Sequence, residues 1–185
     1  MPFDLVLNPA TVKVPQVRTI EKWWGNVPDV TVRKYMAREH QYLLLHEAVL
    51  SSIHYTYPNW MKQKPPKMEP LDYTLRAGFV KAAVLIYASL CEAALRAHAE
   101  KRGYTLPANA RHRTFGKVIA AWNGQPEVAT VWTDLGDLRD MRNNIHLFVA
   151  AGNPKADYKN IIAQEATMLG TANTVLGELM KITSP

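Results

Sequence analysis

One short stretch of the sequence, over residues 138–147, carries residue types that suit phosphate chemistry. Counted from Arg139, the residues Arg142, Asn143 and His146 follow at spacings of three, four and seven positions. On an α-helix, with about 100° of rotation per residue, these four side chains fall within an arc of roughly 100°. The sequence therefore predicts one helical face that presents two cations, an amide and an imidazole.

This combination suits the cleavage of RNA by its own 2′-hydroxyl group. Arginine offers a planar fork of donors that matches phosphate oxygens, and histidine, with an ordinary pKa of about 6.5, accepts and returns a proton near neutral pH. The reaction needs a base, an acid and positive charge on the phosphorane, and these residues supply all three without a metal. A plainer interpretation is the C-terminal half of a helix, where the helix dipole favours cations and His146 is a surface residue.

Arg142 also occupies a position that apolar residues fill elsewhere along the same predicted helix. At multiples of seven residues from it stand Val128, Leu135 and Val149. An arginine in such a seam must be paired, reach a partner surface or hold a ligand, because burying an unpaired cation is costly.

The elements that must position these residues are helical, because apolar residues recur every three or four positions over most of the chain. We expect helices from Asp29 to about His54, from Asp72 to about Lys101, over 115–122, from about Pro126 to Val149, and from Asp157 to the C-terminus. Apolar residues in 3–14 instead alternate with period two around prolines, which predicts an extended N-terminal arm or a short hairpin within residues 1–28. The expected fold is all-α, a four- to five-helix bundle over residues 29–185 that follows this arm.

Composition favours an anionic partner. The 185 residues include 22 Lys and Arg against 16 Asp and Glu, which gives a net charge of +6 and a pI of about 9.4. A basic chain of this kind favours RNA or DNA over an anionic lipid surface, since no basic amphipathic surface helix stands out. The longest apolar run, Ala82 to Cys91, is shorter than the roughly 20 residues that cross a bilayer, so we expect no membrane association.

The sequence lacks the residue patterns of disulfide bonds, metal sites and nucleotide-binding loops. The single cysteine, Cys91, forms no intrachain disulfide bond, and no signal peptide is visible, so we expect a cytoplasmic protein. The remaining histidines lack the spacing of metal ligands, and no glycine-rich nucleotide loop is present. We therefore expect no catalytic metal and no cofactor.

The stretch from Leu138 to His146 resembles the signature of HEPN domains, all-α proteins whose pattern is an arginine, four to six residues, and then a histidine. Arg139 precedes His146 with six intervening residues, and Arg142 does so with three, so both arginines remain candidates for the motif arginine. Glu92 and Arg96 resemble an arrangement of Glu, three residues and a basic residue in some members, although an ordinary ion pair at this helical spacing explains them too. The resemblance covers about residues 29–182.

The resemblance implies a metal-independent endoribonuclease that forms a homodimer, in a toxin–antitoxin or other defence context, with RNA as substrate and an antitoxin or immunity protein as a possible partner. It implies His146 as general acid and base and Arg139 and Arg142 as phosphate ligands. Asn143 would orient the imidazole or donate to a phosphate oxygen, with Glu92 and Arg96 in support. Some members only bind RNA or nucleotide, so a non-catalytic binding dimer is the alternative, and a structural helical adaptor is a third class. Phe148 stands where some members have a tyrosine.

Two further basic segments are candidates for RNA contacts. Lys62, Lys64 and Lys67 lie in a proline-rich segment, and Arg111 and Arg113 flank a histidine between two predicted helices. Exposed lysine and arginine bind backbone phosphates. A solvated linker and an ordinary charged loop explain the same residues equally well.

Overall fold

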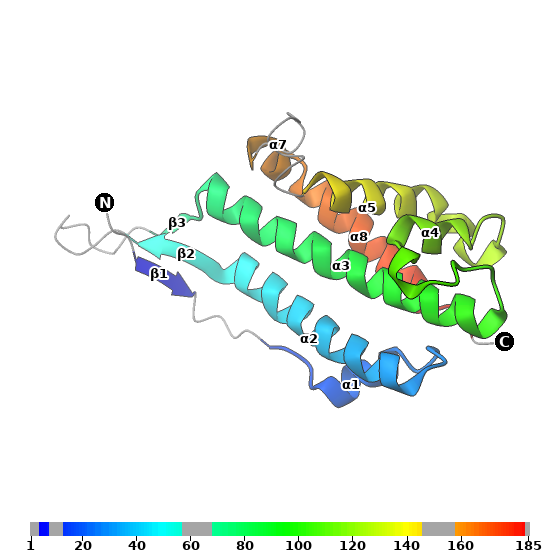
Figure 1. Ribbon diagram of the computed structural model, residues 1–185. Coiled ribbons are helices and arrows are strands. Elements are labelled where there is room, and N and C mark those ends of the chain that lie inside the picture. Colours follow the sequence, from blue (N-terminus) through cyan, green and yellow to red (C-terminus); the bar gives the residue numbers. More distant parts are fainter. Residues whose placement is uncertain (1–3, 8–12, 57–67, 146–157, 184–185) are drawn as a thin grey trace.

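The computed structural model describes residues 4–7, 13–56, 68–145 and 158–183. Its main body is a helical bundle, which confirms the expected fold class, and a small sheet lies at one end (Figure 1). The helices are α1 (Val17–Trp23), α2 (Val30–Ser52), α3 (Tyr73–Arg102), α4 (Phe115–Ala120), α5 (Trp132–Asn144), α7 (Tyr158–Ala163) and α8 (Glu165–Leu179), with 3-10 turns η2 (Ala110–His112) and η3 (Pro126–Val131). The long helix α3 is central, because α2, α4, α5, α7 and α8 all contact it.

The two longest helices both begin where the sequence predicts, and α3 also ends there. The Asp29 carboxylate accepts hydrogen bonds from the backbone N–H groups of the second and third residues after it, at 2.7 and 3.0 Å, and so caps α2. Asp72 caps α3 in the same way, at 2.7 and 3.1 Å. At the other end of α3, Gly103 adopts a left-handed conformation with φ of 70°, which glycine tolerates better than other residues.

The N-terminal region differs from the expected extended arm. Strand β1 (Asp4–Leu7) is extended and pairs antiparallel with β2 (Ile53–Thr56), which in turn pairs with β3 (Met68–Pro70). Residues 17–23 form a helix instead, because Ile20 and Trp24 are both buried in the core. The prediction of an arm extended to residue 28 is therefore wrong for α1, and the strands β2 and β3 replace the end of one predicted helix and part of a predicted loop.

The last two predicted helices are each divided. The segment that begins at Pro126 starts as the 3-10 turn η3 and becomes α-helical only at Trp132. The C-terminal segment consists of α7 and α8, which meet at Gln164, whose φ and ψ of −104° and 3° are not helical.

The core is built around α3. Its buried side chains include Val84, Leu95 and Cys91, and burial raises the pKa of the Cys91 thiol, which fits a structural thiol rather than a nucleophile. Between α2 and α3, the Tyr87 hydroxyl donates to Glu47 Oε1 at 2.6 Å. The part of α3 from Thr74 to Arg102 is long and apolar enough to cross a membrane, but half of its most apolar window is buried inside the bundle.

Candidate functional site

Arg142 of α5 and Glu92 of α3 face each other between the two helices. Arg142 Nη2 lies 3.6 Å from Glu92 Oε2, and the two side chains are 33% and 23% exposed. The guanidinium carbon also lies 5.9 Å from the centre of the Phe115 ring of α4, within cation–π range. The arginine in the apolar seam is thus paired with a carboxylate, one of the three arrangements that its position required.

Glu92 has an altered affinity for protons. Burial raises the pKa of its carboxyl group, and the charges of Arg142 and Arg96 oppose that increase without cancelling it. A carboxyl group that is half-buried beside a guanidinium group, with a raised pKa, is suited to giving and taking a proton. The arrangement therefore combines a cation for a phosphate with a group capable of acid–base chemistry.

Arg96 does not form the expected ion pair with Glu92. Its Nε atom donates to Glu100 Oε1 at 3.0 Å, one helical turn further along α3. Both pairs have the spacing i,i+4, so the sequence alone does not choose between them. The structure pairs Glu92 with Arg142 on another helix instead.

Arg139 lies on the same side of α5 as Arg142. A Cβ atom added at Gly116 would lie 3.4 Å from Arg139 Cδ, so the two arginines contact adjacent residues of α4. The Arg139 Nε atom donates to Asp140 Oδ1 at 2.9 Å. The structure thus pairs Arg142 with Glu92 and places Arg139 against the neighbouring residue of α4, with Asn143 exposed to solvent on the same helix.

Several predicted residues lie outside the described residues. These are His146 and Phe148, which follow α5, and the three lysines Lys62, Lys64 and Lys67. The site is therefore defined structurally by its arginines and by Glu92.

The two arginines near η2 differ in what they contact. Arg113 donates from Nε to the Pro107 carbonyl oxygen at 2.7 Å and from Nη1 to Glu100 at 2.5 Å. The bond to Glu100 joins residue 113 to α3, and the bond to Pro107 closes the segment between them, so Arg113 acts as a structural residue rather than as a free phosphate ligand. The Arg111 side chain is exposed, and only its backbone N–H group donates to Asn109 Oδ1.

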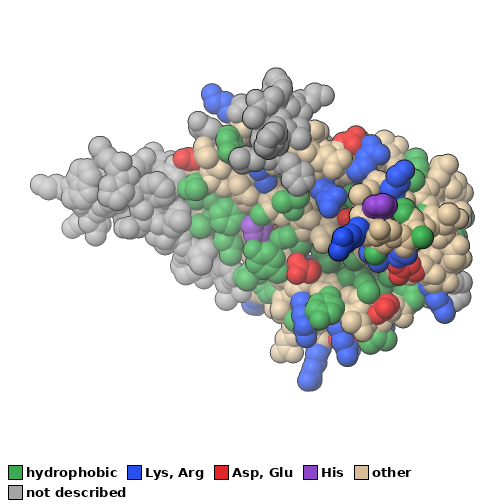
Figure 2. Space-filling model, viewed as in Figure 1, with side chains coloured by type: hydrophobic (Ala, Val, Ile, Leu, Met, Phe, Trp, Pro, Cys, Tyr) green, Lys and Arg blue, Asp and Glu red, His purple; other side chains and the backbone are tan. Residues whose placement is uncertain are grey.

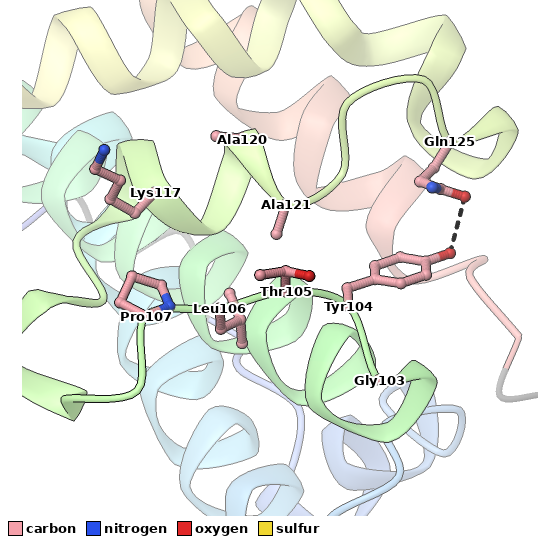
Figure 3. A pocket seen from close by; sticks show the side chains of 9 residues that line it. All are labelled: Gly103, Tyr104, Thr105, Leu106, Pro107, Lys117, Ala120, Ala121 and Gln125. Atoms are coloured by element: carbon pink, nitrogen blue, oxygen red, sulfur yellow. Dashed lines mark hydrogen bonds between the residues drawn. The ribbon is translucent and has the colours of Figure 1, made fainter.

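A cleft of about 650 Å³ lies beside α4 but does not include the arginine site (Figure 3). Its lining residues are Gly103, Tyr104, Thr105, Leu106, Pro107, Lys117, Ala120, Ala121 and Gln125. The Tyr104 hydroxyl donates to Gln125 Oε1 at 3.0 Å across one end of the cleft. Lys117 is the only charged side chain in this lining, which otherwise consists of small, apolar or neutral groups.

Sequence reasoning missed the contribution of α4. Phe115 and Gly116 read as the start of a short apolar helix, and nothing local marks them as neighbours of two arginines. Among the described residues, no group of three or more His, Cys, Asp or Glu side chains is placed to hold a metal ion. Comparisons with protein-family models, with curated proteins and with solved structures found no match to this chain.

Proposed function

We propose that Arg139 and Arg142 of α5 bind an RNA phosphodiester beside Glu92 of α3, and that the chain is a metal-independent endoribonuclease of the HEPN type. The observation that carries this proposal is the Arg142–Glu92 pair, with its separation of 3.6 Å and its partly exposed side chains. A nitrogen–oxygen distance of 3.6 Å is too long for a strong hydrogen bond. The guanidinium group can therefore turn toward a phosphate at little cost.

The proposed reaction depends on Arg142 exchanging Glu92 for a phosphate group. When a phosphate binds Arg142, its negative charge raises the pKa of Glu92 further, because a neighbouring anion disfavours the carboxylate. In the proposed reaction the 2′-hydroxyl group loses its proton to a base as its oxygen attacks phosphorus, and the departing 5′-oxygen gains a proton from an acid. His146 and Glu92 are the two groups proposed for these proton transfers, and the arginines stabilise the charge on the phosphorane.

The remaining parts of the proposal come from the resemblance. They are a homodimer in which two such sites line one cleft, a cytoplasmic location and an antitoxin or immunity protein as a partner. The basic composition of the chain, +6 at neutral pH, supports a nucleic-acid ligand.

A second candidate is an RNA- or nucleotide-binding dimer without turnover. It is favoured by the pairing of both arginines with carboxylates, Arg139 with Asp140 and Arg142 with Glu92. Each pairing reduces the positive charge that a phosphate would meet, which predicts weak, salt-sensitive binding.

The deciding experiment is incubation of the purified chain with labelled single-stranded and structured RNA in EDTA, with products resolved on a gel. We expect cleavage by the wild-type chain, loss of cleavage in His146→Ala and Arg142→Ala, and slower cleavage in Glu92→Gln. Arg18→Ala, at an exposed arginine of α1, is the matched control and should cleave normally. Cleavage that persists in His146→Ala would contradict the proposed mechanism, and binding without products in every variant would favour the second candidate.

A further inference from the structure

The outer face of α2 carries aromatic side chains that the bundle leaves uncovered. Tyr35 is 61% exposed and Tyr42 is 53% exposed. Arg38 lies between them, and residues at positions 35, 38 and 42 share one side of a helix because they are three and four residues apart. Tyr35, Arg38 and Tyr42 are called the α2 stripe below.

A free cation accompanies the aromatic rings. The guanidinium carbon of Arg38 lies 5.5 Å from the centre of the Tyr35 ring. Arg38 is exposed, and no carboxylate among the described residues is paired with it. The arginine of the candidate site, Arg142, does have such a partner. Arg38 therefore keeps its full positive charge toward solvent, and the exposed Lys34 adds a second charge beside it.

The surrounding region is also basic. Residues 13–41 contain six Lys and Arg against three Asp and Glu. Figure 2 shows Lys and Arg side chains with hydrophobic and a few acidic ones beside them over α2, on the same face that carries basic side chains over α4 and α5. The face drawn in Figure 2 therefore carries basic side chains from α2 across to α4 and α5.

The positive charge of this region favours some ligands of the α2 stripe over others. A second copy of the same chain would bring like charges together, and an apolar protein surface would leave Arg38 and Lys34 desolvated without partners. A single nucleic-acid strand offers both complements, since its bases stack on aromatic rings and its phosphates neutralise arginine and lysine. Seven residues of helix separate the two tyrosines by about 10 Å, roughly the length of three stacked nucleotides.

We propose that the α2 stripe is a stacking platform for single-stranded RNA, in which bases lie on Tyr35 and Tyr42 and phosphates contact Arg38 and Lys34. This inference rests on the proposed function, because it names the single strand as the form of RNA that the site receives. The platform holds the strand, and the arginines of α5 receive one of its phosphodiesters.

The test measures binding apart from cleavage. The full chain carrying Arg142→Ala, which removes the proposed cleavage, is titrated into a fluorescently labelled single-stranded RNA in EDTA, and anisotropy reports the affinity. We expect Tyr35→Ala and Tyr42→Ala each to weaken binding roughly tenfold, while the corresponding Phe variants bind as the parent does, because a ring is enough for stacking. Arg38→Ala should weaken binding and reduce the slope of log affinity against log salt by roughly 0.7.

A matched control exists on another helix. Tyr158 is also a partly exposed tyrosine beneath a cation, with Lys81 Nζ 4.5 Å from the centre of its ring. Tyr158→Ala should leave RNA affinity unchanged. An oligonucleotide with the same phosphates but abasic sites should bind equally to the parent and to the tyrosine variants, since it offers no base to stack.

The outcomes separate this inference from the proposed function. If the parent binds RNA and the double variant Tyr35→Ala/Tyr42→Ala binds it equally well, the platform is wrong while the proposed function stands. If the wild-type chain binds no RNA, both are wrong. If sedimentation shows a dimer that the double variant abolishes without a change in RNA affinity, the stripe is a self-association surface and the inference is overturned.

Discussion

Acidification from pH 7 to pH 5 is expected to destabilise the fold through two buried histidines. His40 is 6% exposed and His98 is fully buried. The pKa of each imidazole is lowered from 6.5 to about 4, by burial alone for His40 and by burial together with the charge of the neighbouring Arg102 for His98. In addition, Trp24 Nε1 donates to His40 Nδ1 at 3.1 Å, so this nitrogen must be unprotonated in the folded chain.

The direction of this stability change follows from which state of the chain takes up protons. Between pH 6.5 and about 4 the unfolded chain protonates these imidazoles and the folded chain does not, so the free energy of unfolding falls as the pH falls. For one histidine with these two pKa values, the loss between pH 7 and pH 5 is about 2 kcal/mol, and for two independent ones about 4 kcal/mol. Glu92 changes the free energy of unfolding in the opposite direction. Because its pKa is raised in the folded chain, the folded chain binds this proton at a higher pH than the unfolded chain does.

The assay is urea denaturation at pH 7 and pH 5, followed by tryptophan fluorescence. His40→Gln keeps an acceptor for Trp24 without a titrating ring, and His98→Leu removes an imidazole whose two nitrogens have no hydrogen-bond partner among the described residues. The free energy of unfolding should differ between pH 7 and pH 5 by about 2 kcal/mol less in each variant than in the wild-type chain. His112→Gln, at an exposed position, should leave it unchanged, and a double variant with the full wild-type difference would refute the reasoning.

Three further predictions concern stability. Asp72→Ala removes the cap of α3 and should lower the free energy of unfolding by about 1 kcal/mol, whereas the exposed Asp137→Ala should change it by no more than about 0.5 kcal/mol in the same urea titration. Leu95→Ala leaves a cavity at a fully buried position and should lower the free energy of unfolding by about 2–5 kcal/mol, measured by calorimetry. Leu85 is exposed on the same helix, and Leu85→Ala should lower it by less than about 1 kcal/mol. Arg113→Ala removes the hydrogen bonds of this side chain to Glu100, Pro107 and Ala108 and should accelerate amide hydrogen exchange in residues 107–113; unchanged exchange would show that these three bonds do not hold the segment.

The sequence alone determined the features that depend on neighbours along the chain. The starts of α2 and α3 and the end of α3 follow from Asp29, Asp72 and Gly103, because capping and the left-handed glycine act within one turn of the helix. The shared side of Arg139 and Arg142 likewise follows from helical spacing. These interactions involve residues at most four positions apart, so a linear pattern records them.

Tertiary structure decided the features that depend on residues far apart in the chain. Strand β2 exists because residues 53–56 pair with residues 4–7, and α1 is helical because Ile20 and Trp24 pack into a core that distant segments build. Glu92 had an equally well-spaced partner on its own helix, but the packing of α5 against α3 placed Arg142 opposite it. The choice between a local and a distant partner depends on which side chains share a half-buried space, and that space exists only once the helices are packed.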